Sequence, residues 1–263
     1  MTALTLAVRD SSTMLRRQLT HMTRNPSLLL ILLSVPIIFL LVFVFVLGDT
    51  LGNGLGGGSG GRSTYVNYVT PGILLITITG AVQGTAIAVA MDMTGGIIAR
   101  FRTMAIARVS VLTGHVLGSV VQALLQIVVV IGVAALIGFR PNATAVEWVA
   151  TAGLLVAATF ALVWFSVALG LASNSVETAS NLPMPLMLLP FFGSAFVPTD
   201  SMPVGLRWFA EYQPFTPIME TLRGLLLGTE IGASGWMASG WCAVIALVGY
   251  LWAKRLYNRD RTR

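Results

Sequence analysis

Charged side chains are scarce in this chain, and their scarcity excludes an ordinary soluble domain. Asp, Glu, Lys and Arg make up 10% of the 263 residues, whereas about 25% is usual in soluble globular proteins. The charges are also clustered, and they leave six uncharged stretches, each longer than the roughly 20 residues that a helix needs to cross a bilayer. The stretches are residues 25–48, 63–91, 109–139, 148–176, 178–199 and 231–253. We therefore expect an all-α integral membrane protein with six transmembrane helices.

The residue types that build catalytic and metal centres are also nearly absent. The chain has one cysteine, Cys242, two histidines and one lysine, Lys254. One cysteine cannot form an intrachain disulfide, and with two distant histidines it cannot form a standard zinc site. A phosphate-binding P-loop requires Gly-Lys-Ser/Thr, but Lys254 follows Ala253. We therefore expect no catalytic residue, no metal site and no ATPase motif, and an intramembrane enzyme would lack its reactive cluster.

The basic residues are divided unequally between the two faces that six crossings would create. Twelve of the 16 Lys and Arg residues lie on one face, and the other face holds Arg62, Arg140, Arg207 and Arg223. Cytoplasmic loops carry the excess of Lys and Arg, so we expect a multi-pass protein of the cell membrane with both termini in the cytoplasm. The net charge of +6 then reflects topology and contact with the lipid bilayer. Because the basic residues belong to separate segments, we expect no nucleic-acid binding.

The chain is predicted to be a single transmembrane domain, residues 1–263, with three informative segments outside the stretches. In residues 1–24, apolar positions recur at multiples of about three and a half, which favours a helix lying in the cytoplasmic interface. A disordered basic tail is the alternative. Residues 48–61 are rich in glycine and have no apolar periodicity, so we expect a flexible outer loop.

The cytoplasmic loop at residues 92–112 combines an apolar stripe with arginines. The stripe is Ile97, Ile98, Phe101 and Met104, and the arginines are Arg100, Arg102 and Arg108. This pattern predicts a short amphipathic helix that offers an apolar contact to a partner. A lipid-facing interfacial helix is the alternative reading.

Residues 199–230, on the outer side, contain signals for two short helices. Asp200 or Ser201 can cap a helix that begins near Pro203. Thr216 and Pro217 mark a second start, and Gly228 a stop. Both helices are too short to span a bilayer but are rich in apolar residues, so we expect a re-entrant helical hairpin.

Four charged residues of this segment stand at spacings that permit ion pairs on a helix. Arg207 precedes Glu211 by four residues, and Glu220 precedes Arg223 by three. We expect the tip of the hairpin, near Gln213, to be accessible from outside. The hairpin would then cover the outer end of the bundle.

Several residues within the stretches are candidates for lining a path. In the second stretch, Thr79 and Gln83 are one turn apart, and Gly80 and Gly84 fit a close helix-packing motif. In the fifth, three prolines permit bends, and Met187, Phe191 and Phe192 offer apolar contact. Helix packing is the alternative role for all of these. No acid or base lies deep in any stretch, which disfavours a proton-coupled pump and favours a hydrophobic or amphipathic cargo.

The two loop motifs resemble those of the permease subunit of type-2 ABC exporters, and most of all the daunorubicin-resistance branch that is common in actinobacteria. The resemblance rests on residues 96–102 through Arg108, and on residues 195–203, 216–217 and 222–228. It extends over the whole chain in the number of spans and the order of loops. One departure is Ala105, which stands where the family usually has proline.

The resemblance implies a dimer of permease chains, identical or paralogous, bound to two cytoplasmic ABC ATPase subunits that hold ATP and Mg²⁺. Residues 1–24 would be the connecting helix, residues 92–112 the coupling-helix loop, and residues 199–230 the outer hairpin. Spans one, two and five would meet at the subunit interface. The tentative path residues are Thr79, Gln83, Met187, Phe191 and Phe192, and the outer-gate residues are Trp208, Glu211, Glu220 and Arg223.

The expected function is therefore ATP-driven export of a hydrophobic or amphipathic, drug-like compound. The seven apolar and basic residues of the loop at residues 92–112 would contact the ATPase. An exporter of a lipid or glycan is one alternative. A membrane scaffold or channel without energy coupling is the other.

Overall fold

The computed structural model describes residues 26–54, 61–95 and 108–258 of the chain, and all the regular structure in these ranges is helical. Four helices are long and apolar enough to cross a membrane: α4 (Gly61–Thr94), α6 (Arg108–Leu136), α7 (Ala145–Ala172) and α12 (Ser234–Asn258). A fifth candidate is a pair of helical segments that meet at 70° near residue 47. The described residues therefore confirm an all-helical chain with four or five candidate spans.

The bent pair belongs to the first uncharged stretch. Helix α2 (Pro26–Leu41) continues through a π-helical turn, η1 (Val42–Val46), into α3 (Gly48–Gly54). The expectation of a flexible loop is thus wrong for residues 48–54. A Cβ atom at Gly52 would overlap the backbone of Gly61, so glycine here permits α3 to lie close to the start of α4.

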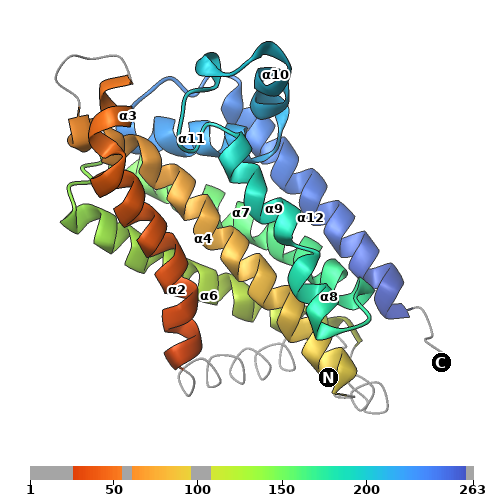
Figure 1. Cartoon of the computed structure of the whole chain (residues 1–263). Coiled ribbons are helices and arrows are strands. Elements are labelled where there is room, and N and C mark those ends of the chain that lie inside the picture. The colour runs from red at the N-terminus through yellow and green to blue at the C-terminus, as the bar shows by residue number, and fades with distance from the viewer. Residues whose placement is uncertain (1–25, 55–60, 96–107, 259–263) are drawn as a thin grey trace.

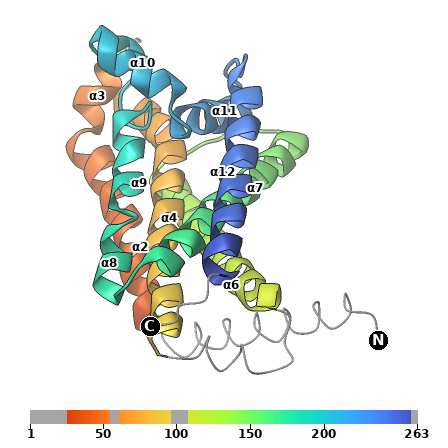
Figure 2. The same ribbon diagram turned by 90° about the vertical axis from the view of Figure 1, so that its right-hand side faces the viewer.

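The fifth stretch is not one continuous helix. It is divided into α8 (Val176–Asn181), α9 (Met184–Leu188) and the 3₁₀-helix η2 (Leu189–Phe192). Pro183, Pro185 and Pro190 lack the backbone N–H that would continue the helical hydrogen bonds. None of the three pieces is long enough to cross a membrane by itself, but together they run from one end of the bundle to the other (Figures 1 and 2).

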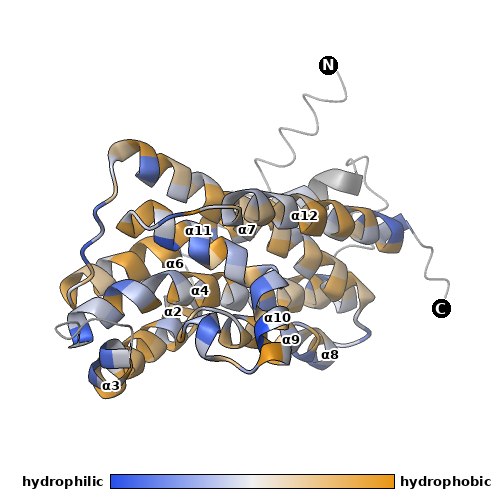
Figure 3. Ribbon diagram, turned by 90° about the horizontal axis from the view of Figure 1, so that it is seen from above, coloured by the Kyte–Doolittle hydropathy of each residue, from blue (hydrophilic) through white to orange (hydrophobic). Residues whose placement is uncertain are grey.

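The two ends of the bundle are built differently. The start of α2, the end of α4, α8 and the end of α12 lie at the lower end in Figure 1, whereas α3, α10 and α11 lie at the upper end. Seen from above, the long helices are mainly hydrophobic, and hydrophilic residues gather on α10, α11 and the last turns of α12 (Figure 3). We use "upper end" and "lower end" in this sense below.

Helix α4 is the central element and contacts α2, α6, α7, α8 and α11. Its side chains are buried along most of its length. At Gly72 a Cβ atom would lie 2.8 Å from the Cβ of Ala195, so this glycine permits close approach of the segment that follows η2. At Gly80 and Gly84 a Cβ would meet nothing within 4 Å. Those two glycines are therefore not close-packing points within this chain.

Candidate functional site

Two short helices form a hairpin at the upper end. Helix α10 (Val204–Tyr212) follows the 3₁₀-turn η3 (Thr199–Ser201), and α11 (Phe215–Leu227) follows Pro214. Gly228, at φ 76°, ends α11 in the left-handed conformation, as its sequence position predicts. The predicted cap is wrong: Asp200 and Ser201 lie in η3, and Pro203 occupies the N-cap position of α10 without a side-chain hydrogen bond.

The two helices of the hairpin differ in burial. Ala210 is the one buried residue of α10, and Trp208 is 68% exposed. Helix α11 is almost entirely buried and contacts α4, α7 and α12, across the upper end of the bundle (Figure 2). The backbone N–H of Asn142 donates to the carbonyl of Leu226 at 2.9 Å, which also attaches α11 to the loop before α7.

Arg223 of α11 connects three separate segments. Its side chain is 7% exposed, and Nη1 donates to Oε1 of Glu220 at 2.8 Å. Nη2 donates to the carbonyl oxygens of Ser194, at 2.9 Å, and Tyr68, at 3.3 Å. The guanidinium carbon lies 3.9 Å from the centre of the Tyr68 ring. Because an unpaired buried charge is costly, these contacts hold α11 against α4 and against the segment after η2.

Gln213, between α10 and α11, forms a second connection. Its side-chain Nε2 donates to the carbonyl of Leu189 at 3.1 Å and to Oγ1 of Thr216 at 3.3 Å. Gln213 itself is 5% exposed, so its own side chain is not the accessible part of the tip, and accessibility of the tip from outside stays a prediction for its neighbours. The exposed neighbour is Tyr212, at 54%.

Gly193 lies where these connections meet. The backbone N–H of the next residue, Ser194, donates to Oγ1 of Thr216 at 3.4 Å. A Cβ atom at Gly193 would overlap the side chains of Gln213 and Thr216. We call residues 193–194, 213, 216, 220 and 223, together with Tyr68, the hairpin joint.

The joint is well connected but not fully satisfied. Three of its buried polar atoms have no hydrogen-bond partner among the described residues: Oγ of Ser194, Oε1 of Gln213 and Nε of Arg223. Each of these atoms can still form a hydrogen bond: the two oxygens can accept one, and Nε of Arg223 can donate one.

The four predicted gate residues do not form one cluster. Glu220 and Arg223 pair within the joint, as their spacing predicts. Arg207 pairs with Glu211 at 2.7 Å and with Asp200 at 2.6 Å on the exposed helix. The hydrogen bond that Arg207 donates to Glu211, followed by the negative charges of Asp200 and Glu211, raises the pKa of Arg207 above its ordinary value. Trp208 and Glu211 thus lie on the surface of α10, outside the joint.

The predicted path residues have different environments. Thr79 is 1% exposed, and its hydroxyl donates to the carbonyl of Ile76 in its own helix at 2.8 Å. Nε2 of Gln83 donates to the carbonyl of Ser180 at 3.0 Å, which connects α4 to α8. Met187 is half-buried. The side chains of Thr79 and Gln83 therefore both form hydrogen bonds within the chain.

Phe191 and Phe192, also predicted for the path, are both partly exposed, at 36% and 47%. The ring of Phe191 lies 5.0 Å from that of Phe196 and 5.5 Å from that of Phe39. Phe196 in turn stacks on Phe43 at 4.0 Å. These rings connect α2 and η1 with the end of the fifth stretch, next to the joint.

Most of the predicted coupling residues lie outside the described part of the chain. This holds for Ile97, Ile98, Arg100, Phe101, Arg102 and Met104, for the side chain of Arg108, and for residues 1–24. The helices on either side of the loop are described. Nε2 of His115 in α6 lies 3.0 Å from Oδ2 of Asp92 in α4, and these side chains are 13% and 17% exposed. This half-buried pair joins the two helices that flank residues 96–107.

Residues 10–227 match the family described as ABC-2 type transporter. The chain is 25% identical over 188 residues to a daunorubicin resistance ABC transporter permease protein of Streptomyces coeruleorubidus. It is 27% identical over 190 residues to a probable doxorubicin resistance ABC transporter permease protein of Mycobacterium tuberculosis. These alignments cover 69% and 67% of this chain, and 66% and 67% of the relatives, or about two thirds of their length.

Proposed function

The chain belongs to the ABC-2 type transporter family, and from this membership we propose that it is the membrane-spanning permease subunit of an ATP-driven exporter. The family match over residues 10–227 carries the proposal. A separate cytoplasmic ABC ATPase would bind ATP and Mg²⁺ and supply the energy. This chain would supply the membrane path and have no ATPase activity of its own.

The proposed cargo is a hydrophobic or amphipathic, drug-like compound. The names of the relatives, which refer to daunorubicin and doxorubicin resistance, support this class. So does the position of carboxylates in the described candidate spans: Asp92 lies in the last turn of α4, and Glu147 in the first turn of α7. Among the described spans, neither carboxylate is at the depth that a proton-coupled pump would use.

The proposed topology has six spans, with the lower end in the cytoplasm. Five spans would be α2 with η1, α4, α6, α7 and α12, and the sixth would be the series α8, α9 and η2. The course of that series from the lower to the upper end supports this assignment (Figure 1). Lys254 and Arg255 lie at the lower end, and they belong to the set of twelve Lys and Arg residues that the sequence assigns to one face, which predicts that this face is cytoplasmic.

The hairpin α10–α11 is the proposed outer gate. Helix α11 packs over α4, α7 and α12, and the joint attaches it to the end of the fifth stretch through Arg223, Gln213 and Thr216. Opening would break these hydrogen bonds and release the three unpartnered polar atoms to other partners. Two packings that differ by a small set of polar contacts suit a switch between closed and open states.

A second permease chain, identical or paralogous, would complete the path. The exposed apolar side chains of α2 and of the fifth stretch, such as Ile38, Leu188 and Phe192 at 56%, 55% and 47% exposure, would face it. Phe191, Phe192 and Met187 would then border the passage. Thr79 and Gln83 would contribute by supporting helix packing on its wall.

Energy coupling would act through the lower end. The loop at residues 92–112 would seat Phe101 in a cleft of the ATPase. Nucleotide binding would favour one of the two packings and so shift their populations. Because Asp92 and His115 join α4 to α6, a displacement of the loop would reach both helices together.

Reconstitution tests the proposal directly. The chain is co-expressed with a candidate ABC ATPase from the same organism, purified as a complex and placed in proteoliposomes. ATP-dependent accumulation of daunorubicin, lost in an ATPase-deficient variant of the partner, is the expected result. Transport of a labelled lipid or glycan, without transport of daunorubicin, would show that the proposed cargo class is wrong. If no ABC ATPase binds the chain, a scaffold or channel without energy coupling becomes the better proposal.

A further inference from the structure

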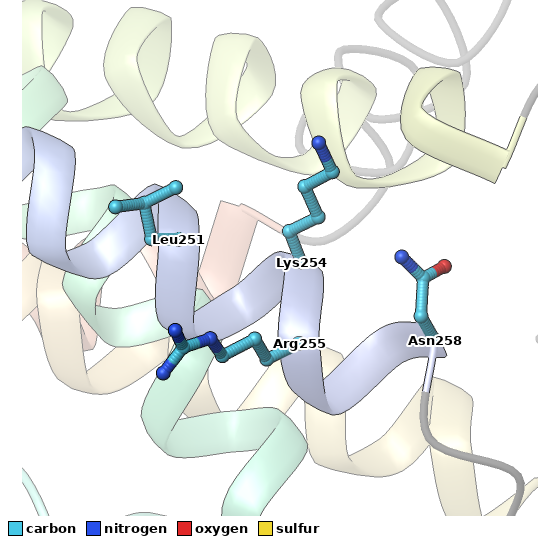
Figure 4. Close-up of a pocket in the computed structure, with 4 residues that line it drawn as sticks. All are labelled: Leu251, Lys254, Arg255 and Asn258. Carbon is cyan, nitrogen blue, oxygen red and sulfur yellow. The ribbon is translucent and has the colours of Figure 1, made fainter.

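An open groove lies at the lower end of α12. It has a volume of about 570 Å³ and is lined by Leu251, Lys254, Arg255 and Asn258. All four side chains are exposed, and Lys254 and Arg255 leave the helix in different directions (Figure 4). The groove therefore combines two cations, one amide and one apolar side chain within two helical turns.

The cations of the groove have no carboxylate partner among residues 26–54, 61–95 and 108–258. The contact of Lys254 in these ranges is with the ring of Tyr250, at 6.0 Å. At the upper end, by contrast, three arginines have carboxylate partners: Arg62 pairs with Asp49, and Arg207 and Arg223 pair with glutamates. Within the described residues, the positive charge of the groove is therefore not neutralised by a carboxylate.

An apolar stripe leads from the interior of the membrane to these cations. Val244, Leu247, Val248 and Leu251 lie on one side of α12 and are 52%, 60%, 48% and 46% exposed. With a rise of 1.5 Å per residue, Val244 and Lys254 are about 15 Å apart along the helix axis. This is half of the roughly 30 Å hydrocarbon core of a bilayer, so the stripe has the length of one leaflet.

We propose that this surface binds an anionic phospholipid of the leaflet at the lower end. The phosphate lies between Lys254 and Arg255, the amide of Asn258 donates a hydrogen bond to the headgroup, and an acyl chain lies along Leu251 and Leu247. A free phosphate would use the cations but not the apolar stripe that continues from them. The proposal requires that the chain lies in a membrane, and it does not depend on the cargo or on the ATPase.

Native mass spectrometry of the purified full-length chain measures this binding, with phosphatidylglycerol and phosphatidylcholine as probes. We expect the natural chain to retain phosphatidylglycerol in preference to phosphatidylcholine. Lys254→Gln combined with Arg255→Gln lowers that preference on the order of tenfold, since basic side chains near a membrane surface each attract anionic lipid. Lys254→Arg with Arg255→Lys keeps it. The matched control removes the same charge at the upper end, Arg62→Gln with Arg207→Gln, and leaves the preference unchanged.

Three further outcomes decide between this site and its alternatives. An equal loss of lipid preference in the upper-end control would show that the preference depends only on the net charge of the chain. The proposed lipid site would then be wrong. Displacement of phosphatidylglycerol by inorganic phosphate at the same concentration would identify an anion site without a role for the stripe, and would also overturn it. In a Cys242→Ser background, Lys254→Cys is expected to react with a water-soluble maleimide in lipid-free detergent and to be protected by phosphatidylglycerol.

The same labelling experiment detects a protein segment in the groove. If Lys254→Cys fails to react even without lipid, part of the chain covers the groove, and the lipid proposal is wrong. Reaction that phosphatidylglycerol does not slow would equally contradict it.

Discussion

At the upper end of the bundle, arginines are held by partners of the same chain, whereas at the lower end Lys254 and Arg255 face outward without a carboxylate in the described part of the chain. Arg223 is buried and bonded to Glu220 and to two backbone carbonyls. Arg140, likewise at the upper end, donates to the carbonyls of Ala135 and Phe139 at 2.7 Å and 3.0 Å. One end therefore uses its cations to close the structure, and the other leaves them available to lipid or to a partner.

The difference indicates which substitutions should damage the fold and which should damage communication with a partner. Changes in the hairpin joint remove contacts within the chain. Changes in the predicted coupling loop and in the groove of α12 would remove proposed contacts to other molecules, and a change at Asp92 would weaken a contact between α4 and α6.

The largest effect is expected at Arg223. Arg223→Met leaves Glu220 and the carbonyls of Ser194 and Tyr68 without their donor, and we expect a loss of about 3 kcal/mol in stability, as for a broken buried pair. Thermal unfolding in detergent measures it. Glu220→Gln combined with Arg223→Met should recover part of the loss. The control Arg207→Met, on exposed α10, should leave unfolding unchanged, and an equal loss there would contradict the difference between the two helices.

The next largest effect is expected at Phe101, in the predicted coupling loop outside the described residues. Phe101→Ala removes a proposed apolar anchor, which is typically worth on the order of 2 kcal/mol at an interface. We expect the chain to fold and reach the membrane while cargo-stimulated ATP hydrolysis by the purified complex is lost. Phe209→Ala, at the upper end, is the control and should retain stimulation. Unchanged stimulation in Phe101→Ala would remove this loop from the coupling mechanism.

A smaller effect is expected at Gly193. In Gly193→Ala the added methyl group meets Gln213 and Thr216, and overpacking of this kind costs about 1–3 kcal/mol. Because the strain falls on the joint, the hairpin should open more readily, seen as faster hydrogen exchange of α11 amides. Gly205→Ala in α10 meets open space and provides the control. Equal exchange in both variants would show that the joint does not restrain α11.

The smallest effect is expected at Asp92. Asp92→Asn keeps a side chain that can hydrogen-bond to His115 but removes its charge, and we expect a loss of about 1 kcal/mol. The coupling ratio, which is the amount of cargo transported per ATP hydrolysed, should fall clearly. The melting temperature of the complex should fall only slightly. Asp49→Asn removes the exposed partner of Arg62 at the opposite end and should change neither quantity. A fall in melting temperature without a fall in coupling would assign the pair to stability alone.

The parts of the hairpin that depend on near neighbours could be predicted from the sequence. The pairs Arg207–Glu211 and Glu220–Arg223 follow from helical spacing, and Gly228 ends α11 because a left-handed residue is needed there. The cap at Asp200 or Ser201 could not be placed, because these residues form their own 3₁₀-turn instead.

The hairpin joint could not be predicted, because its contacts join segments far apart in the chain. Gln213 reads as a turn residue next to Pro214, and nothing near it indicates that it reaches Leu189. The contacts of Arg223 with Tyr68 and Ser194 are equally distant. The one local signal was Gly193, directly after the sequence Pro-Phe-Phe, where a glycine permits close approach.

A hydropathy analysis identifies apolar segments but does not predict where a helix is interrupted. It groups residues 178–199 as one stretch, although three prolines divide the segment into α8, α9 and η2. Conversely, the glycines of residues 48–54 obscure the helix α3. In both places the backbone properties of proline and glycine, rather than polarity, decide the structure.

Cysteine labelling tests the assignment of the two ends most directly. In a Cys242→Ser background, Tyr212→Cys places a thiol at an exposed position of the hairpin, and Asn258→Cys places one at the end of α12. We predict that a membrane-impermeant maleimide labels Tyr212→Cys on intact cells, and labels Asn258→Cys only after the membrane is opened. The reverse pattern would place the hairpin in the cytoplasm and contradict both the outer gate and the coupling end.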